Sequence, residues 1–329
     1  MSDMTFPVPL PRQRGPVTVR FGSLDEDLDA VHEGDLLWWG RDFVAERIAS
    51  IPSGTPYAIL VAELDGRLVA DAFVVGRGVA QGGYAMGGVY VHPQARRRGV
   101  GSAMVEALAD ATSAWGLPGF AGQTHELDSD GLAAGERMGF ERMGHHRESV
   151  LDLDSLDVQA AETAAARAAE GGFELRPLPD DADDTDWQRL YDEVVVPTWR
   201  DAPDAEGADE IMPLQVFRAF FPHPYYVLVA WDAERPVGIT AVMDRAKDEA
   251  LNTMFTGVVA GSRGMGLSTA LKARHALDMK ARGHHRVFTQ NMDQNARILA
   301  ANDRLGFSVV PGFFAMGRPV SPVPASGSE

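Results

Sequence analysis

The chain has 329 residues, enough for two domains of about 150 residues each, and its hydrophobic content of 45% suffices for ordinary buried cores. The absence of cysteine excludes disulfides, thiolate metal sites and cysteine nucleophiles, and a net charge of −17 disfavours nucleic acid as a partner. No run approaches 18 apolar residues and the first 15 residues have no apolar core segment, so we expect a cytoplasmic protein without a membrane span or signal peptide.

The predicted elements of the first half begin after a loose, flexible tail over residues 1–16. Patterning predicts an opening strand, a helical region, two strands around a tight turn, a strand leading into an Arg- and Gly-rich loop, a helix, and a further strand. A short helix ending at a Gly-Phe pair and a last strand complete this half. The ranges are Val17–Phe21, Trp38–Ile48, Tyr57–Leu64, Leu68–Val75, Tyr84–Val91, Ser102–Ala114 and Gly119–His125.

The second half repeats this order after an Ala- and Glu-rich segment. Residues 154–172 close with two glycines, which predicts a helical linker that stops there. The helix that follows the second loop is more polar on one face than its counterpart in the first half. The corresponding ranges are Phe173–Arg176, Trp187–Val195, Tyr226–Trp231, Pro236–Met243, Leu251–Val259, Thr269–Ala281 and Arg286–Asn291.

This order predicts an α+β protein with two tandem domains, at residues 17–153 and 173–319. Each is expected to be a mixed, mostly antiparallel sheet flanked by helices, in three layers. Residues 320–329 contain Pro, Ser and Gly and are expected to form a disordered tail.

A loop that recurs 167 residues later is the strongest evidence for duplication. In residues 91–102 a Val stands five residues before an Arg and eight before a Gly, and residues 258–269 repeat this spacing. Four landmarks at one offset indicate two copies of one domain. The others are Trp115-Gly116 with Arg282-Gly283, and Arg137-Met138-Gly139-Phe140 with Arg304-Leu305-Gly306-Phe307.

The repeated loop has the composition of an anion-binding site. Glycines between a strand and a helix let the main chain approach a bulky anion, and the helix N-terminus adds partial positive charge. Such a loop suits a pyrophosphate, and the cluster Arg96-Arg97-Arg98 suits an additional phosphate. It is neither a dinucleotide fingerprint nor a Walker loop, because Gly-x-Gly-x-x-Gly and Gly-Lys-Ser/Thr are absent.

The Arg-Met/Leu-Gly-Phe motif places its Gly 40 residues after the loop Gly in both copies. With the loop, the strand order and the domain length, this makes about 290 of the 329 residues resemble a tandem member of the GCN5-related N-acetyltransferase (GNAT) family. The resemblance implies acetyl-CoA, or another acyl-CoA, as donor and direct transfer of the acetyl group to a primary amine of a small molecule.

The resemblance also implies which residues contact the cofactor: the two loops, the helix starts and the strands before them. In the first copy these are Val89, Val91, Arg96, Arg97, Arg98, Gly99, Val100, Gly101 and Ser102. In the second copy they are Val258, Arg263, Gly264, Met265, Gly266, Leu267 and Ser268.

The copies diverge beyond the strand that follows the helix. The second has Asn291, Asn295 and Asn302 where the first has Thr124, Asp128 and Gly135. These asparagines resemble a cofactor-contacting segment of active tandem members, and their alternative role is to cap the short helix. We therefore expect the chemistry in the C-terminal copy, with Asn291 and Asn295 at the cofactor, although Ser268 replaces the second loop glycine there.

The general acid and base are not identified by the resemblance. Many family members have a Tyr shortly before the Gly-Phe motif as the acid, and some have a Glu base on the strand before the loop. Gly135 and Asn302 stand at the first position, and Ala85 and Asn252 at the second. Asn302, Asn252 and Thr256 are the polar candidates for catalytic positions in the second copy.

Three alternatives stay open: a mycothiol-synthase-like enzyme, an N-acetyltransferase for protein or peptide amines, and a non-catalytic acyl-CoA-binding protein. No metal site is expected, because the adjacent pairs His145-His146 and His284-His285 would point to opposite faces of a strand. No nucleic-acid or membrane partner is expected. The two copies could pack as an internal pseudo-dimer, so a monomer and a homodimer are both compatible with the duplication.

Overall fold

The computed structural model describes residues 9–23, 27, 48–49, 51, 53–76, 83–179, 181–202, 211–245 and 248–321. Residues 38–47 of the expected helical region, residues 1–8 of the expected N-terminal tail and residues 322–329 of the C-terminal tail lie outside this range. The described residues form two compact units. Unit 1 contains those up to Gly144 and those from Phe314 onward, and unit 2 contains those from His145 to Phe313.

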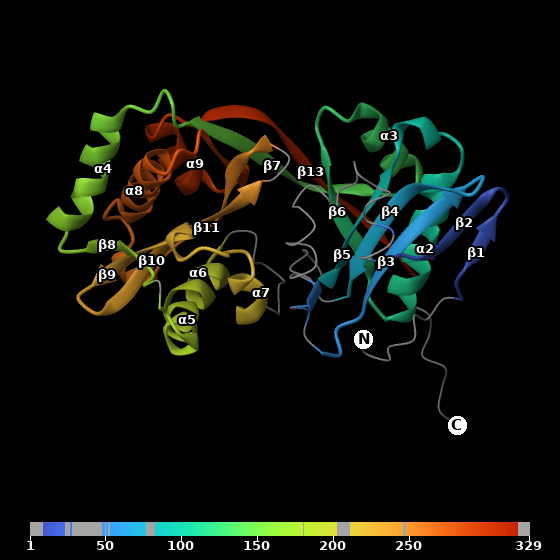
Figure 1. Cartoon of the computed structure of the whole chain (residues 1–329), viewed down its shortest axis with the longest axis horizontal. Coiled ribbons are helices and arrows are strands. Elements are labelled where there is room, and N and C mark those ends of the chain that lie inside the picture. Colours follow the sequence, from blue (N-terminus) through green and yellow to red (C-terminus); the bar gives the residue numbers. More distant parts are fainter. Residues whose placement is uncertain are drawn as a thin grey trace. The chain divides into compact units, whose positions relative to one another are not determined.

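Unit 1 is built on a sheet in which most neighbouring strands run antiparallel. Helix α2 (Val100–Ala114) packs against this sheet, and α3 (Ser129–Arg137) follows its last parallel strand (Figure 1). The buried side of α2 is apolar, and it contributes Met104 and Leu108 to a core shared with the strands. The antiparallel strands are β2 (Val17–Phe21), β3 (Tyr57–Leu64), β4 (Arg67–Val75) and β5 (Ala85–Val91), and β6 (Gly119–His125) runs parallel to β5.

The N-terminal segment differs from the expected loose tail. Residues 12–14 form strand β1 (Arg12–Arg14), which pairs with β2. Two arginines of β1 also reach α2, where Arg12 pairs with Asp110 at 2.5 Å and Arg14 with Glu106 at 2.6 Å. The free edge of β2 and these ion pairs order a segment whose polar composition resembles a tail.

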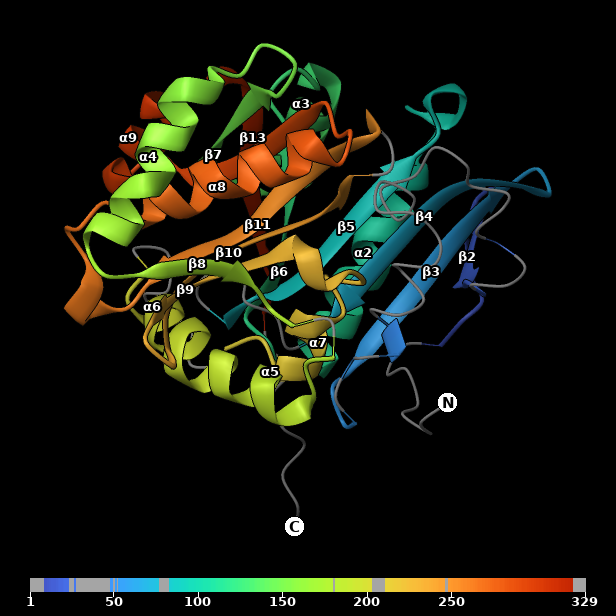
Figure 2. The ribbon, with the colours of Figure 1, turned by 60° about the vertical axis from the view of Figure 1, so that its left-hand side comes forward.

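Unit 2 repeats this plan with a helix layer on each face of its sheet. On one face α4 (Val158–Glu170) lies along α8 (Leu267–Ala281), and on the other are α5 (Asp184–Leu190), α6 (Val196–Arg200) and α7 (Leu214–Arg218) (Figure 2). A π-helical turn, Tyr191–Val195, joins α5 to α6. The strands are β8 (Glu174–Pro177), β9 (Val227–Asp232), β10 (Arg235–Arg245), β11 (Ala250–Val258) and β12 (Arg286–Met292), antiparallel except for β11 and β12.

The segment expected as a linker is part of unit 2. Asp157 caps α4 by accepting from the backbone N–H of Ala160 at 3.0 Å, and Gly171 follows its last turn. Ala161 and Ala168 of α4 are buried, and Ala168 joins the same hydrophobic cluster as Leu271 of α8. The helix thus covers the sheet of unit 2 rather than only connecting two domains.

The closing strands of the two repeats divide between the units. Residues His146–Asp152 of β7 (Glu141–Asp152) pair with β12 in unit 2. The last residues of β13 (Ser308–Pro319) belong to unit 1, where Arg318 Nη1 donates to the Val105 carbonyl at 3.2 Å. The expected domain boundaries at Leu153 and Pro319 follow the sequence repeat. In the structure, however, the closing segment of each copy belongs to the unit that is formed mainly by the other copy.

The mixed, mostly antiparallel sheets flanked by helices confirm the predicted fold class. Most predicted strands and helices begin and end within one or two residues of the observed bounds. Within the described ranges, no helix is both long and apolar enough to cross a membrane.

Candidate functional site

Among the described strands, each unit has one parallel pair, and the two strands of that pair separate after a short contact. In unit 1, β5 and β6 pair only at Ala85 with Phe120 and Met86 with Ala121. In unit 2, β11 and β12 pair from Leu251 to Thr253 and then diverge. Backbone groups beyond these points have no strand partner across the divergence, so an extended polar ligand can bind them in place of a strand.

Both loops lead into helices whose first N–H groups are open. Gly99 precedes α2 with φ 85° and Gly266 precedes α8 with φ 78°, and neither helix has a side-chain cap. In contrast, Asp128 caps α3 and Asn295 caps α9 (Ala296–Arg304). The uncapped N–H groups and the helix dipole together favour an anion at each loop.

The exposure pattern of the two loops is the same. Residues 96–99 and 263–266 are exposed, and the next residue, Val100 or Leu267, is buried. A Cβ on Gly99 or Gly266 would meet no atom within 4 Å, so glycine is not required there by packing. Its role is the left-handed backbone and the open approach of a ligand to the main chain.

The conserved spacing between Val and Arg in the two loops has a structural cause. Arg96 Nε donates to the Val91 carbonyl at 3.1 Å, and Arg263 Nε donates to the Val258 carbonyl at 2.8 Å. Each arginine therefore ties its loop back to the end of the preceding strand. Three of the arginines expected to contact the cofactor also pair with carboxylates: Arg98 with Asp65 at 2.9 Å, Arg263 Nη2 with Asp201 at 2.7 Å, and Arg96 Nη1 with Asp128 at 4.0 Å.

Of the two diverging strands that precede the loops, β5 and β11, only β11 of unit 2 has a bulge among the residues described. Ala241 of β10 pairs with Phe255, but its neighbour Val242 pairs with Thr253, so Met254 is an extra residue in β11. In unit 1 the register between β4 and β5 is uninterrupted over residues 70–75 and 86–91. A bulge leaves backbone groups unpaired and is common beside active sites.

The three asparagines of the second copy occupy different environments. Asn295 is the N-cap of α9, with its side chain accepting from Ile298 N at 3.5 Å, as in the capping alternative. Asn302 is buried, with Oδ1 accepting from Lys272 Nζ at 2.5 Å and Nδ2 donating to Asn291 Oδ1 at 2.9 Å. Asn291 is half-buried on β12, beyond the last residue paired with β11.

Lys272 and His275 were missed by the sequence reasoning, which recognised only that α8 has a more polar face. Both are buried, and burial lowers the pKa of Lys272 to about 7 and that of His275 to about 4. They line a small cavity with Thr240 and Thr253 that has room for about one water molecule. Nδ1 of His275 has no hydrogen-bond partner among the described residues.

The three catalytic candidates do not form one cluster. Thr256 Oγ1 lies 3.0 Å from Thr240 Oγ1, and Thr240 lines the cavity beside α8, as does Thr253. Asn302 lies on the same side of the sheet, because it accepts a hydrogen bond from Lys272 of α8. Asn252 precedes Thr253 on the strand and therefore points to the opposite face, where its buried Oδ1 has no partner among the described residues.

A buried ion pair lies on the face of Asn252. Glu148 Oε1 accepts from Arg245 Nη1 at 2.8 Å and from Gln290 Nε2 at 3.1 Å, and both charged side chains are at most 6% exposed. The guanidinium of Arg245 also stacks 4.0 Å from the ring centroid of Phe288. The contact joins residues 97 positions apart in sequence, so no local motif could have indicated it.

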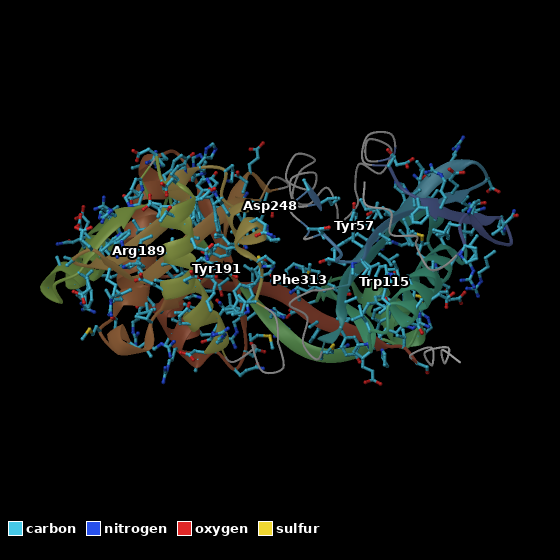
Figure 3. All side chains as sticks on the ribbon, turned by 90° about the horizontal axis from the view of Figure 1, so that it is seen from below. Tyr57, Trp115, Arg189, Tyr191, Asp248 and Phe313 are labelled. Atoms are coloured by element: carbon cyan, nitrogen blue, oxygen red, sulfur yellow. The ribbon has the colours of Figure 1, made fainter. Side chains whose placement is uncertain are left out.

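Aromatic side chains cover β11 on this same face. Trp199 of α6 stacks on Phe255 with ring centroids 5.8 Å apart, and Phe217 of α7 meets Phe255 edge-on at 5.9 Å. Tyr191, labelled in Figure 3, follows α5. Its ring packs against that of Phe217, with centroids 6.3 Å apart. Trp199 and Phe255 are only half-buried, so this layer presents partly accessible aromatic surface beside the irregular strand.

Comparisons with known proteins agree with this geometry. A model of the acetyltransferase (GNAT) domain matches residues 55–142, and no curated protein matches the sequence. The structure is similar to a tandem GNAT protein from the clavulanic acid biosynthesis pathway, with a TM-score of 0.66 and 19% identity over 93% of this chain and 99% of that one. A GCN5-related N-acetyltransferase from Sphaerobacter thermophilus has a TM-score of 0.63 and 15% identity over 94% and 98% of the chains.

A third similar structure is the glucosamine N-acetyltransferase region of a fungal multi-domain GH3 β-N-acetylglucosaminidase. Its TM-score is 0.65 at 15% identity, over 92% of this chain and 38% of that one. At these identities the structures show a common fold. Residues 55–142 match the acetyltransferase (GNAT) domain model, and the chain as a whole has the fold of the tandem GNAT structures to which it is similar.

Proposed function

We propose that the protein is an acyl-CoA-dependent N-acetyltransferase that moves an acetyl group from acetyl-CoA directly to a primary amine of a small molecule. The observation that carries this proposal is the combination, in unit 2, of an uncapped helix N-terminus at Gly266 with diverging parallel strands. This combination offers an anion site next to unpaired backbone edges, which matches a ligand with a pyrophosphate and an amide-containing arm.

Unit 2 would hold the cofactor with backbone groups rather than with charged side chains. The amides of residues 264–268 would bind the pyrophosphate, and the edge of β11 near Val258 would bind the pantetheine arm. Bound acetyl-CoA supplies an activated acyl group. The bulge at Met254 leaves backbone groups of β11 free to stabilise negative charge on a carbonyl oxygen.

Two features support chemistry in unit 2 rather than in unit 1. The bulged strand is found there, and so is the polar set of Lys272, Asn302 and Asn291. At the matching positions unit 1 has Val105, Gly135 and Thr124. Unit 1 keeps its loop and open helix N-terminus, so we propose that it also binds CoA without catalysing transfer.

The acceptor would approach from the face of the sheet covered by α5–α7. The half-buried rings of Trp199 and Phe255 can pack against an apolar body or a cationic amine. The net charge of −17 favours the approach of a cation. The proton of the ammonium must leave before attack, and we assign no residue to that step.

The acceptor class is tested with a panel of amines incubated with acetyl-CoA, using mass spectrometry to detect the acetylated product. The panel contains polyamines, amino sugars (because one similar structure is a glucosamine N-acetyltransferase region), a cysteinyl amine as in mycothiol synthesis, and peptides with free lysine and N-terminal amines. We expect a small amine to be acetylated. Acetylation confined to peptides would contradict the small-molecule acceptor.

A non-catalytic acyl-CoA-binding protein is the second candidate. It is favoured by one observation: the positions of the usual acid and base hold Asn302 and Asn252, whose carboxamides do not titrate. The same panel separates the two, because a binding protein would bind acetyl-CoA and acetylate none of the amines.

A further inference from the structure

Three polar side chains of unit 2 form a hydrogen-bonded chain across α8, α9 and β12. Lys272 Nζ donates to Asn302 Oδ1 at 2.5 Å, and Asn302 Nδ2 donates to Asn291 Oδ1 at 2.9 Å. Lys272 and Asn302 are 4% and 1% exposed, so bulk solvent does not compete for these bonds. The chain connects the buried interior of unit 2 to the diverging part of β12.

The direction of this chain fixes which way each carboxamide faces. The amine of Lys272 donates to Oδ1 of Asn302, so the amide nitrogen of Asn302 is turned toward Asn291. Asn291 must then present its oxygen to Asn302, and its own amide nitrogen is left over. Among the described residues, no acceptor lies within hydrogen-bond distance of that nitrogen.

Asn291 lies where a ligand would replace a strand. β12 pairs with β11 only as far as Thr289, and β7 covers the other edge of β12 at Arg147. A ligand entering between β11 and β12 would therefore meet a side-chain N–H donor. Such a donor matches a carbonyl oxygen of an amide-containing arm.

The fold itself does not require Lys272. At the same position of the equivalent helix, unit 1 has Val105, which is buried among apolar side chains. An apolar residue at such a site avoids the desolvation of an amine, and replacing buried charged groups by apolar ones is often neutral or stabilising. A buried lysine retained in only one of two copies is thus better explained by what it orients than by packing.

We propose that Lys272 is a positioning residue of the acyl-CoA site in unit 2: through Asn302 it orients Asn291 to donate to a carbonyl oxygen of the pantetheine arm. This inference rests on the proposed function. Lys272 makes no contact with the ligand in this arrangement and acts only through the two asparagines.

The test measures CoA and ADP binding to the full chain by calorimetry, together with the melting temperature of each variant. ADP carries the diphosphate but no pantetheine arm, so it reports on the loop alone. The variants are Lys272→Met, which removes the donor, and Asn302→Asp, which keeps a partner for Lys272 but can only accept. Val105→Met is the matched control in unit 1.

We expect Lys272→Met and Asn302→Asp to weaken CoA binding at the unit 2 site about three- to tenfold, the effect of losing one hydrogen bond, and to leave any CoA site in unit 1 unchanged. In Asn302→Asp the amide of Asn291 must turn its nitrogen toward the new carboxylate and present its oxygen to the ligand. ADP binding should be unchanged in both variants, and the melting temperature of Lys272→Met should not fall. Val105→Met should match the wild type for both ligands.

Several outcomes would overturn the inference. Unchanged CoA binding in Lys272→Met and Asn302→Asp would show that the chain is only structural, and equal weakening of CoA and ADP would show general damage to unit 2. If Val105→Met weakened CoA binding by the same factor, the effect would not be specific to the hydrogen bonds of Lys272, Asn302 and Asn291. If Lys272→Met does not fold, Asn302→Asp decides alone, and a wild type that binds neither ligand would overturn the proposed function itself.

Discussion

Lys272 affects folding differently at acidic and alkaline pH. Burial lowers its pKa to about 7 in the folded protein, against an ordinary value of 10.5, so the unfolded chain holds a proton between these pH values that the folded chain releases. Folding stability from this group therefore rises as the pH increases from about 7 to 10.5 and is lowest below 7. His275, in the same cavity, has a pKa lowered to about 4 and stays neutral throughout.

A comparison of Lys272→Met with the wild type isolates this effect. We expect the melting temperature of the variant to exceed that of the wild type most at pH 6, and the difference to shrink by pH 9.5, because each unit of pKa shift corresponds to about 1.4 kcal/mol. Thermal unfolding of both proteins at the two pH values measures it. A difference that is constant with pH would mean that Lys272 is not buried as a titrating amine.

Arg245 and Arg14 form ion pairs of opposite character. Arg245 is 6% exposed and pairs with Glu148, whereas Arg14 is 51% exposed and pairs with Glu106. Arg245→Met leaves a buried carboxylate without its guanidinium and should lower the free energy of unfolding by about 3–5 kcal/mol. Arg14→Met should lower it by less than about 1 kcal/mol. Urea unfolding of the two variants tests this, and equal losses would contradict the difference in burial.

At the scale of elements, the asparagines at α9 and on β12 have different expected roles, one in capping a helix and the other in binding the cofactor. Asn295 caps α9, so Asn295→Ala should cost about 1 kcal/mol of stability. Asn291 faces the divergence, so Asn291→Ala should weaken CoA binding with a smaller loss of stability. Urea unfolding and calorimetry on both variants distinguish the roles. If Asn295→Ala weakened CoA binding as much as Asn291→Ala, the cap would also be a cofactor contact.

The order and type of elements could be predicted because period and turn residues are local properties. β3, β6 and the helix after each loop were placed within two residues of the observed bounds. Strand β1 was missed because Arg12-Gln13-Arg14 has no apolar alternation and is ordered by the edge of β2 and by α2. The pairing of β7 with β12 could not be predicted, because either copy offers a suitable partner strand.

For the candidate site, too, only the features formed by residues close together in sequence could be predicted. The two loops were located from sequence because their glycines and arginines lie close together in the chain. Lys272 and Asn302 are 30 residues apart, and Glu148 and Arg245 are 97 apart, so their contacts depend on tertiary packing. The polar positions on the second helix were visible in the sequence, but nothing there indicated that Lys272 is buried.

At the scale of the whole molecule, the two copies share one loop architecture and differ in the polar side chains around it. Both copies keep a loop braced by an arginine and an uncapped helix behind a left-handed glycine. Among the described residues, only unit 2 has a bulge within the diverging strand itself, at Met254 of β11, and a buried polar chain beside it. This pattern is expected when one copy retains chemistry and the other retains only binding or structural support.

Acetyl transfer in unit 2 is tested by measuring the release of free CoA from acetyl-CoA in the presence of an accepted amine. The assay compares the wild type with Gly266→Val and Gly99→Val, which place the same strained side chain at equivalent left-handed positions. We predict turnover by the wild type, its loss in Gly266→Val and its retention in Gly99→Val. Loss in Gly99→Val alone would place the chemistry in unit 1, and no turnover by the wild type with any amine would contradict the account.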